Sequence, residues 1–207
     1  MSIKLVFDKG ISLPHKKSTF FSQHDGFGVF RYIATDGSKK SVIYIRFDET
    51  GESKLLTNGE DPRVFEYNNN VYILDNTMNL CSIFNVSTPT KRYKIPLTGK
   101  NFTFFSDKEH LFIIEWFFPL TIYEVIFIKD SIKLQKRNTR PDQSVKNHEF
   151  RGGTPAYRNG NGVWFGIGHQ TYSHKKTLMH RLFGYNINFS NLRNFFGNVS
   201  SSYSTNN

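Results

Sequence analysis

The sequence predicts an all-β fold, and two observations carry that prediction. Of its 207 residues, 21 are Phe and 10 are Tyr, and aromatic and β-branched residues favour strands. The apolar residues also occur in short runs bounded by Gly, Asn, Asp or Pro, and no segment of helical length keeps a period of 3.6 residues. A single domain of this length can bury a substantial core.

The apolar runs are predicted strands. In chain order they are Ser41–Phe47, Val71–Leu74, Leu111–Glu115, Thr121–Phe127, Val163–Gly168 and Leu182–Asn186. Residues 48–51, 68–70 and 158–162 contain the Gly and Asn typical of hairpin turns. Strands at this spacing are compatible with a sandwich, a barrel or a propeller, and the pattern alone does not choose among them.

Cysteine content and the N-terminal residues bear on the compartment. Cys81 is the only cysteine, which excludes an intramolecular disulfide and any zinc site built on several thiolates. Residues 1–9 are too charged for a signal peptide, and no window has the length of a membrane span. We therefore expect a cytoplasmic protein that does not associate with membranes. We expect no metal, because the histidines lack the carboxylate context of a zinc site.

The positive charge is concentrated in one part of the chain. Residues 129–193 hold twelve Lys and Arg against three Asp and Glu, whereas the net charge of the whole chain is +10. Such a segment suits nucleic acid, or a small anion such as a sugar phosphate or inorganic phosphate. No helix-turn-helix, zinc-finger or RNP-type pattern accompanies it, so nucleic acid is the less favoured partner.

The turn Glu60-Asp61-Pro62-Arg63 is the most informative local motif. It places two adjacent carboxylates and an arginine on a proline-stiffened bend that runs directly into a predicted strand hairpin. A solvated surface turn has the same composition. An acid held beside a cation also suits chemistry on a polar substrate, and the residues alone leave both interpretations open.

Two further groups of residues occur where loops meet strands. Lys100 and Asn101 follow Gly99 at one junction, and Arg151 precedes Gly152-Gly153-Thr154-Pro155 at another. Two glycines would let the backbone approach a ligand closely, and the planar guanidinium of Arg151 suits an anion or vicinal hydroxyls. His169 follows a Gly-x-Gly strand and is expected to face the same space, although a histidine at a strand end is more often structural.

Taken together, these motifs resemble a group of five-bladed β-propeller carbohydrate enzymes. Their order and approximate spacing over residues 40–188 are similar to those of the β-mannoside phosphorylase family of glycoside hydrolases and the related β-mannosyltransferases. The resemblance implies a single β-propeller domain over residues 1–197, followed by a Ser-rich tail, 198–207, that we expect to be disordered. Because the chain has material for about four blades plus fragments, a closed ring and one left incomplete at its C-terminal end both stay open.

The resemblance also implies a function. Asp61 corresponds to a general acid in an inverting transfer of a glycosyl, most simply mannosyl, unit by a glycoside phosphorylase or glycosyltransferase, with Glu60 and Arg63 setting its pKa and orientation. The residues implied to bind substrate or phosphate are Glu60, Arg63, Lys100, Asn101, Arg151, Gly153, Thr154 and His169. No cofactor is implied beyond a co-substrate such as inorganic phosphate, a sugar phosphate or a nucleotide sugar. The alternative is a non-catalytic glycan-binding or structural propeller that keeps these motifs as scaffold.

Overall fold

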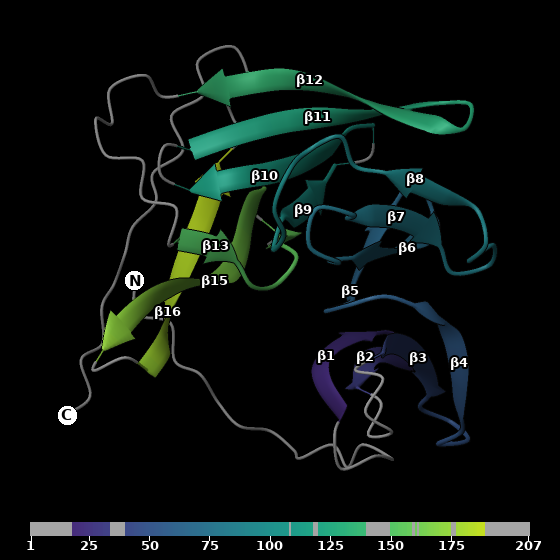
Figure 1. The fold of residues 1–207 in the computed structure, drawn as a ribbon. Helices are drawn as coiled ribbons and strands as arrows, with labels where there is room; N and C mark the ends of the chain where they lie inside the picture. Colours follow the sequence, from purple (N-terminus) through teal and green to yellow (C-terminus); the bar gives the residue numbers. More distant parts are fainter. Residues whose placement is uncertain are drawn as a thin grey trace. The chain divides into compact units, whose positions relative to one another are not determined.

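The computed structural model describes residues 18–33, 40–107, 109–117, 120–139, 150–158, 160, 162–174 and 177–188. This part of the chain forms 16 strands and no helix (Figure 1). The strands build four antiparallel sheets of four strands each, which is the composition of propeller blades. The prediction of an all-β, propeller-class fold is confirmed. The expected tail, 198–207, lies outside the described residues.

The chain divides into two compact units. The amino-terminal unit comprises residues 4–100 together with 127–132, and the carboxy-terminal unit comprises residues 1–3, 101–126 and 133–207. Each unit contains two of the sheets, so each can be described by itself.

The amino-terminal unit contains two four-stranded meanders, in which every strand pairs with the next one along the chain. The first is β1 (Ser18–His24), β2 (Phe27–Ile33), β3 (Ser41–Phe47) and β4 (Ser53–Asn58), and the second is β5 (Arg63–Tyr67), β6 (Asn70–Asp75), β7 (Ser82–Asn85) and β8 (Arg92–Lys94). Asn68 and Asn69 connect β5 to β6 with φ of 49° and 57°. Positive φ at two successive residues is the geometry of a tight hairpin turn.

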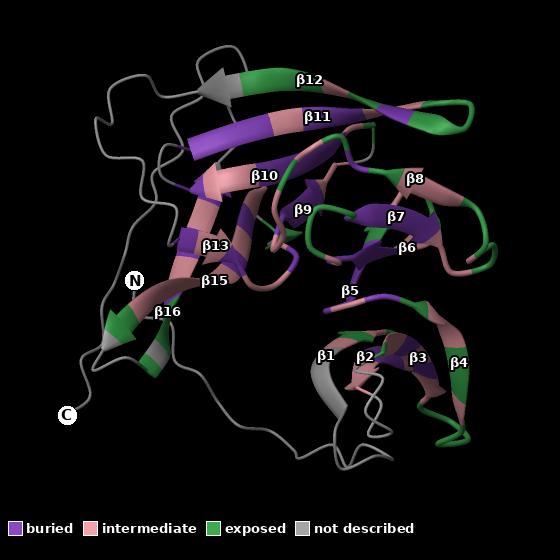
Figure 2. Cartoon of the chain, in the orientation of Figure 1, coloured by how far each residue is buried: buried purple, intermediate pink, exposed green. Residues whose placement is uncertain are grey.

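The core of this unit is mostly aliphatic and lies between its two sheets. Val29 and Ile43 of the first sheet pack with Val64, Ile73 and Phe84 of the second, and all five are at most 2% exposed. β5, β6 and β7 each bury three successive residues, whereas β3 buries alternate ones (Figure 2).

The carboxy-terminal unit contains the other two sheets. One is β9 (Thr103–Ser106), β10 (Leu111–Phe117), β11 (Leu120–Ile128) and β12 (Ser131–Thr139); the other is β13 (Phe150–Gly152), β14 (Tyr157–Arg158), β15 (Val163–His174) and β16 (Thr177–Asn188). In the second of these sheets β15 is central, with β16 along one side and both β13 and β14 along the other. The tip of the β11–β12 hairpin, residues 127–132, belongs to the amino-terminal unit.

The core of the carboxy-terminal unit is aromatic. Phe105 and Phe117 of one sheet pack with Trp164, Phe183 and Tyr185 of the other. The indole Nε1 of Trp164 donates a hydrogen bond to the carbonyl oxygen of Ser106 at 3.1 Å, so the ring is fixed as well as buried. No helix among the described residues is long and apolar enough to cross a membrane.

A buried carboxylate on β11 links two basic side chains in the carboxy-terminal unit. The Glu124 side chain is 10% exposed; its Oε1 lies 2.6 Å from Nδ1 of His110, and its Oε2 accepts a hydrogen bond from Nε of Arg137 at 2.7 Å. Burial acts to raise the pKa of Glu124, but the hydrogen bonds from His110 and Arg137 outweigh it and lower the pKa below its usual 4.5.

The lowered pKa predicts an acid-sensitive contribution to stability. Because the folded-state pKa lies below the unfolded value, the contribution is complete above about pH 4.5 and is lost as the pH falls through the folded-state pKa. In urea titrations at a series of pH values, Glu124→Gln should therefore show a shallower loss of stability below pH 4.5 than the wild type. Glu109→Gln is the matched control, because Glu109 is 85% exposed and lies 3.9 Å from the same histidine. Equal acid slopes for the wild type and Glu124→Gln would contradict the assignment.

Candidate functional site

The Glu60-Asp61 turn is held in place by residues that follow β6. The backbone N–H of Asn76 donates to the carbonyl of Glu60 at 2.8 Å, and the Asn76 side-chain amide donates to the carbonyl of Asp61 at 2.8 Å. Asp75 Oδ1 accepts the backbone N–H of Glu60 at 2.9 Å. Asp61 itself adopts a left-handed conformation, with φ of 43°. The turn is therefore a clamped element rather than a solvated bend.

The Asp61 carboxylate points into the protein, where cations contact both of its oxygens. Its Oδ1 accepts a hydrogen bond from Nη1 of Arg31 at 2.8 Å, and its Oδ2 lies 3.4 Å from Nζ of Lys100. The Asp61 side chain is 3% exposed. The structure thus brings Lys100 to Asp61. Sequence reasoning missed Arg31, which lies on β2, 30 residues before its partner, and has no local signal.

The two neighbours of Asp61 in the motif have different surroundings. Arg63 is 7% exposed and begins β5. The Glu60 side chain is 29% exposed, and its Oε2 lies 3.6 Å from Nη2 of Arg31. Glu60 is therefore the more accessible of the two adjacent carboxylates.

Arg151 and His169 lie side by side on adjacent strands of the carboxy-terminal unit. They are cross-strand partners in the β13–β15 pairing. The Arg151 guanidinium lies 3.9 Å from the ring centroid of Trp116, and its Nη1 is buried with no hydrogen-bond partner among the described residues. Burial lowers the pKa of Arg151, while the charge of Glu115 opposes that change.

The glycines beside Arg151 lie tightly against neighbouring segments. A Cβ on Gly152 would lie 2.0 Å from Oγ1 of Thr103, and a Cβ on Gly153 would lie 2.4 Å from the carbonyl oxygen of Ile167. The glycines therefore let the backbone approach neighbouring strands closely. Thr154 serves the same packing, since its N–H donates to the Ile167 carbonyl at 2.8 Å and its Oγ1 accepts the Ile167 N–H at 3.0 Å.

His169 and Asn101 are also placed somewhat differently from the sequence prediction. His169 lies inside β15 rather than after its end, because β16 pairs with β15 along all twelve residues of that strand. The His169 ring makes an edge contact with His180 at 5.3 Å. Asn101 has a φ of 64°, and its carbonyl accepts the N–H of Gly152 at 3.0 Å. Its backbone thus joins the start of one sheet to the other sheet of that unit.

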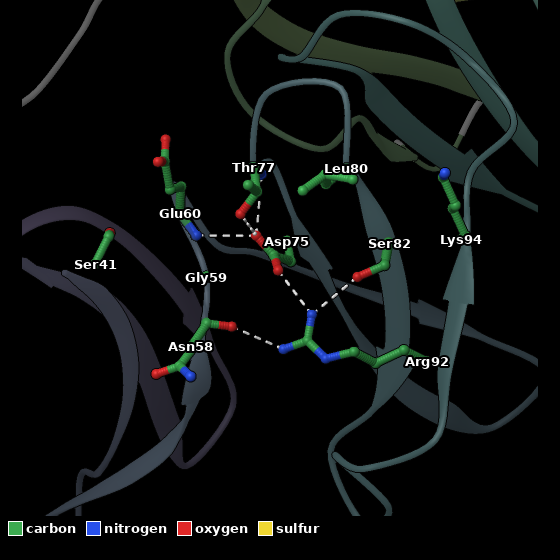
Figure 3. Close-up of a pocket in the computed structure, with 10 residues that line it drawn as sticks. All are labelled: Ser41, Asn58, Gly59, Glu60, Asp75, Thr77, Leu80, Ser82, Arg92 and Lys94. Carbon is green, nitrogen blue, oxygen red and sulfur yellow. Dashed lines mark hydrogen bonds and ion pairs between the residues drawn. The ribbon is translucent and has the colours of Figure 1, made fainter.

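A cavity of about 470 Å³ adjoins the clamped turn within the amino-terminal unit. Asn58, Gly59 and Glu60 form one side of it, and residues of β6, β7, β8 and the β6–β7 turn form the other (Figure 3). Within the described part of the chain, no group of three or more His, Cys, Asp or Glu side chains is placed to hold a metal ion.

No protein-family model matches the chain, and no curated protein matches it either. Solved structures similar to it include the N-terminal domain of Nup159 (14% identity, TM-score 0.46, 83% of this chain and 45% of that one). An endo-arabinase from Bacteroides thetaiotaomicron is 12% identical, with TM-score 0.48 over 93% of this chain and 82% of that one. A mannose phosphorylase from Leishmania mexicana, solved with a phosphate ion, is 12% identical, with TM-score 0.45 over 83% of this chain and 62% of that one. This chain thus spans less than half of the Nup159 domain.

Because Gly153 is tightly packed, we expect two glycine substitutions to differ greatly in their effect on the free energy of unfolding. Gly153→Ala places a Cβ against backbone that cannot move aside, whereas a Cβ on Gly160 meets nothing within 4 Å. We expect Gly153→Ala to lower the free energy of unfolding by about 2 kcal/mol or more, and Gly160→Ala to leave it nearly unchanged. Urea denaturation followed by tryptophan fluorescence measures both. If Gly153→Ala were as stable as Gly160→Ala, the packing role of Gly153 would be wrong.

Proposed function

We propose that this chain is a carbohydrate-binding β-propeller protein in which the Glu60-Asp61 turn serves as scaffold rather than as catalytic machinery. The observation that carries the proposal is the environment of Asp61. A general acid must present its proton to the substrate. The Asp61 side chain is 3% exposed, and each of its oxygens already contacts a cation of the same chain.

Two features support a carbohydrate as the ligand. The motifs resemble those of carbohydrate-active propellers, and a cavity of about 470 Å³ with both polar and apolar side chains in its wall lies directly beside the clamped turn. That volume falls in the usual range of small-molecule sites, roughly 300–1,000 Å³. Glu60, the accessible carboxylate of the turn, lines the cavity and can accept hydrogen bonds from sugar hydroxyls.

Asp61→Asn distinguishes a scaffold from a catalyst. As scaffold, the substitution leaves Arg31 and Lys100 without their anion and should lower the free energy of unfolding by about 3 kcal/mol. Glycan binding by the folded fraction should stay unchanged, because the side chain does not reach the ligand. Thermal denaturation and a glycan array, both run with the wild type and the variant, measure the two effects.

Asp130→Asn is the matched control. It makes the same chemical change in a surface ion pair, in which Asp130 is 85% exposed and lies 2.8 Å from Lys91, so little loss of stability is expected. A fully stable Asp61→Asn that loses turnover of a mannoside or mannosyl donor would reject the scaffold role. Failure of the wild type to bind any carbohydrate on the array would reject the proposed function itself.

Glycosyl transfer with phosphate as the acceptor is the second candidate, and one observation favours it. The Nη1 of Arg151 is buried and has no partner among the described residues. A buried guanidinium N–H without a hydrogen bond is costly, and an anion such as phosphate would satisfy it. In this candidate Arg151 and its cross-strand partner His169 bind the phosphate that accepts the glycosyl unit.

Arg151→Ala tests this second candidate through phosphate binding. Inorganic phosphate at 100 times its Kd would stabilise the wild type by about 2.7 kcal/mol, and Arg151→Ala should lose most of that stabilisation. Arg158→Ala is the control, since its guanidinium also lies over a tryptophan ring, 5.0 Å from the centroid of Trp164. Thermal shifts with phosphate and with chloride of equal ionic strength give the measurement. Equal phosphate-dependent shifts in both variants would exclude Arg151 as the phosphate ligand.

A further inference from the structure

On one side of the cavity beside the clamped turn, the oppositely charged side chains of Asp75 and Arg92 hold each other in place. Asp75 Oδ1 accepts hydrogen bonds from the Thr77 N–H at 3.0 Å and the Thr77 hydroxyl at 2.7 Å, in addition to the Glu60 N–H. Its Oδ2 accepts Nη1 of Arg92 at 2.7 Å. Arg92 also donates to the Ser82 hydroxyl and to the carbonyl of Asn58, each at 2.9 Å. These groups satisfy one another, so they shape the cavity and leave little hydrogen-bonding capacity for a ligand.

Other side chains around the cavity keep their functional groups available. The Glu60 carboxylate is partly exposed, and it forms an ion pair with Arg31 at 3.6 Å, beyond hydrogen-bond distance, so its oxygens can still accept hydrogen bonds. Lys94 is exposed, and no ion pair of its ammonium occurs within the described ranges. Leu80 is 59% exposed and lines the same cavity. Figure 3 shows Glu60 and Lys94 on opposite sides of the Asp75–Arg92 pair, with Leu80 between them.

The balance of these groups selects the class of ligand. Lys94 would attract an anion, but the carboxylate of Glu60 would repel it. Glu60 would attract a cation, but Lys94 would repel it. The backbone N–H groups of Glu60 and Thr77, which would otherwise bind an anion, already donate to Asp75. An uncharged molecule rich in hydroxyls can donate to Glu60 and accept from Lys94 at once. Its apolar C–H face can cover Leu80, which offers no polar group of its own.

We propose that this cavity binds one or two uncharged sugar units, with hydroxyls bonded to Glu60 and Lys94 and a ring face on Leu80. The proposal rests on the proposed carbohydrate-binding function and gives that function its site. Neither Asp61 nor Arg151 lines the cavity. The site is therefore distinct from the residues that the family resemblance implied for catalysis and phosphate binding, apart from Glu60.

Calorimetric titration of the full chain with D-mannose, β-1,4-mannobiose, cellobiose and L-arabinose tests the site, with inorganic phosphate as the anionic comparator. Glu60→Gln and Lys94→Gln should each weaken the binding of a sugar about tenfold, the loss expected for one hydrogen bond to a charged group. Leu80→Asp should weaken it at least as much. Lys54→Gln is the matched control, since Lys54 is an exposed lysine on β4 of the same unit. Circular dichroism and thermal denaturation confirm that each variant is folded.

The outcomes separate this site from the proposed function. Weaker sugar binding in the three cavity variants, with Lys54→Gln unchanged, supports the site. Unchanged sugar binding in all of them overturns the site, while the carbohydrate-binding function stands. Phosphate that binds through Lys94 in competition with the sugars overturns the uncharged class of ligand. A wild type that binds no sugar in titration and none on the glycan array overturns both proposals.

Discussion

The candidate site depends on the hydrogen bonds that the buried carboxylate of Asp75 accepts. Asp75 is 3% exposed, yet it accepts hydrogen bonds from two backbone N–H groups, a hydroxyl and a guanidinium. Buried charge is costly unless it is fully paired, and these donors offset that cost. Through Arg92 the same carboxylate reaches the end of β4, at the carbonyl of Asn58. One buried anion therefore fixes the turn that carries Glu60 and the floor of the adjacent cavity, and it joins the two sheets of the amino-terminal unit.

The hydrogen bonds that hold the turn place the adjacent carboxylates of Glu60 and Asp61 in opposite surroundings. Asp61, at a φ of 43°, turns its side chain into the protein, where Arg31 and Lys100 contact it. Glu60 stays partly exposed and lines the cavity. Proximity in sequence therefore does not give these residues a common role. In this fold the Asp61 carboxylate is buried and paired with two cations, and the Glu60 carboxylate is partly exposed at the cavity.

The sequence predicted strand limits best where a turn directly follows the apolar residues of the strand. β3 has the predicted bounds, 41–47, because its apolar residues are followed directly by the Asp48–Gly51 turn. β15 and β16 run well beyond their predicted limits, since pairing along the whole hairpin supports polar residues that carry no strand signal. β2 was not predicted, although its Val29 and Phe30 are fully buried. At the candidate site, the sequence motifs included the turn and Lys100, which lies beside Asp61, but no local signal pointed to Arg31.

By itself, the sequence determined the all-β class, the position of the Glu60-Asp61 turn, and the hairpin at Asn68 and Asn69. Each of these follows from interactions within a few residues, such as turn conformation, proline stiffness and alternation along a strand. Only the tertiary structure decided what surrounds those residues. Arg31 reaches Asp61 across 30 residues of sequence because strands far apart in the chain become neighbours, and Gly153 faces the backbone of β15 for the same reason. Burial and ion pairing depend on which strands become neighbours, and no local pattern encodes that choice.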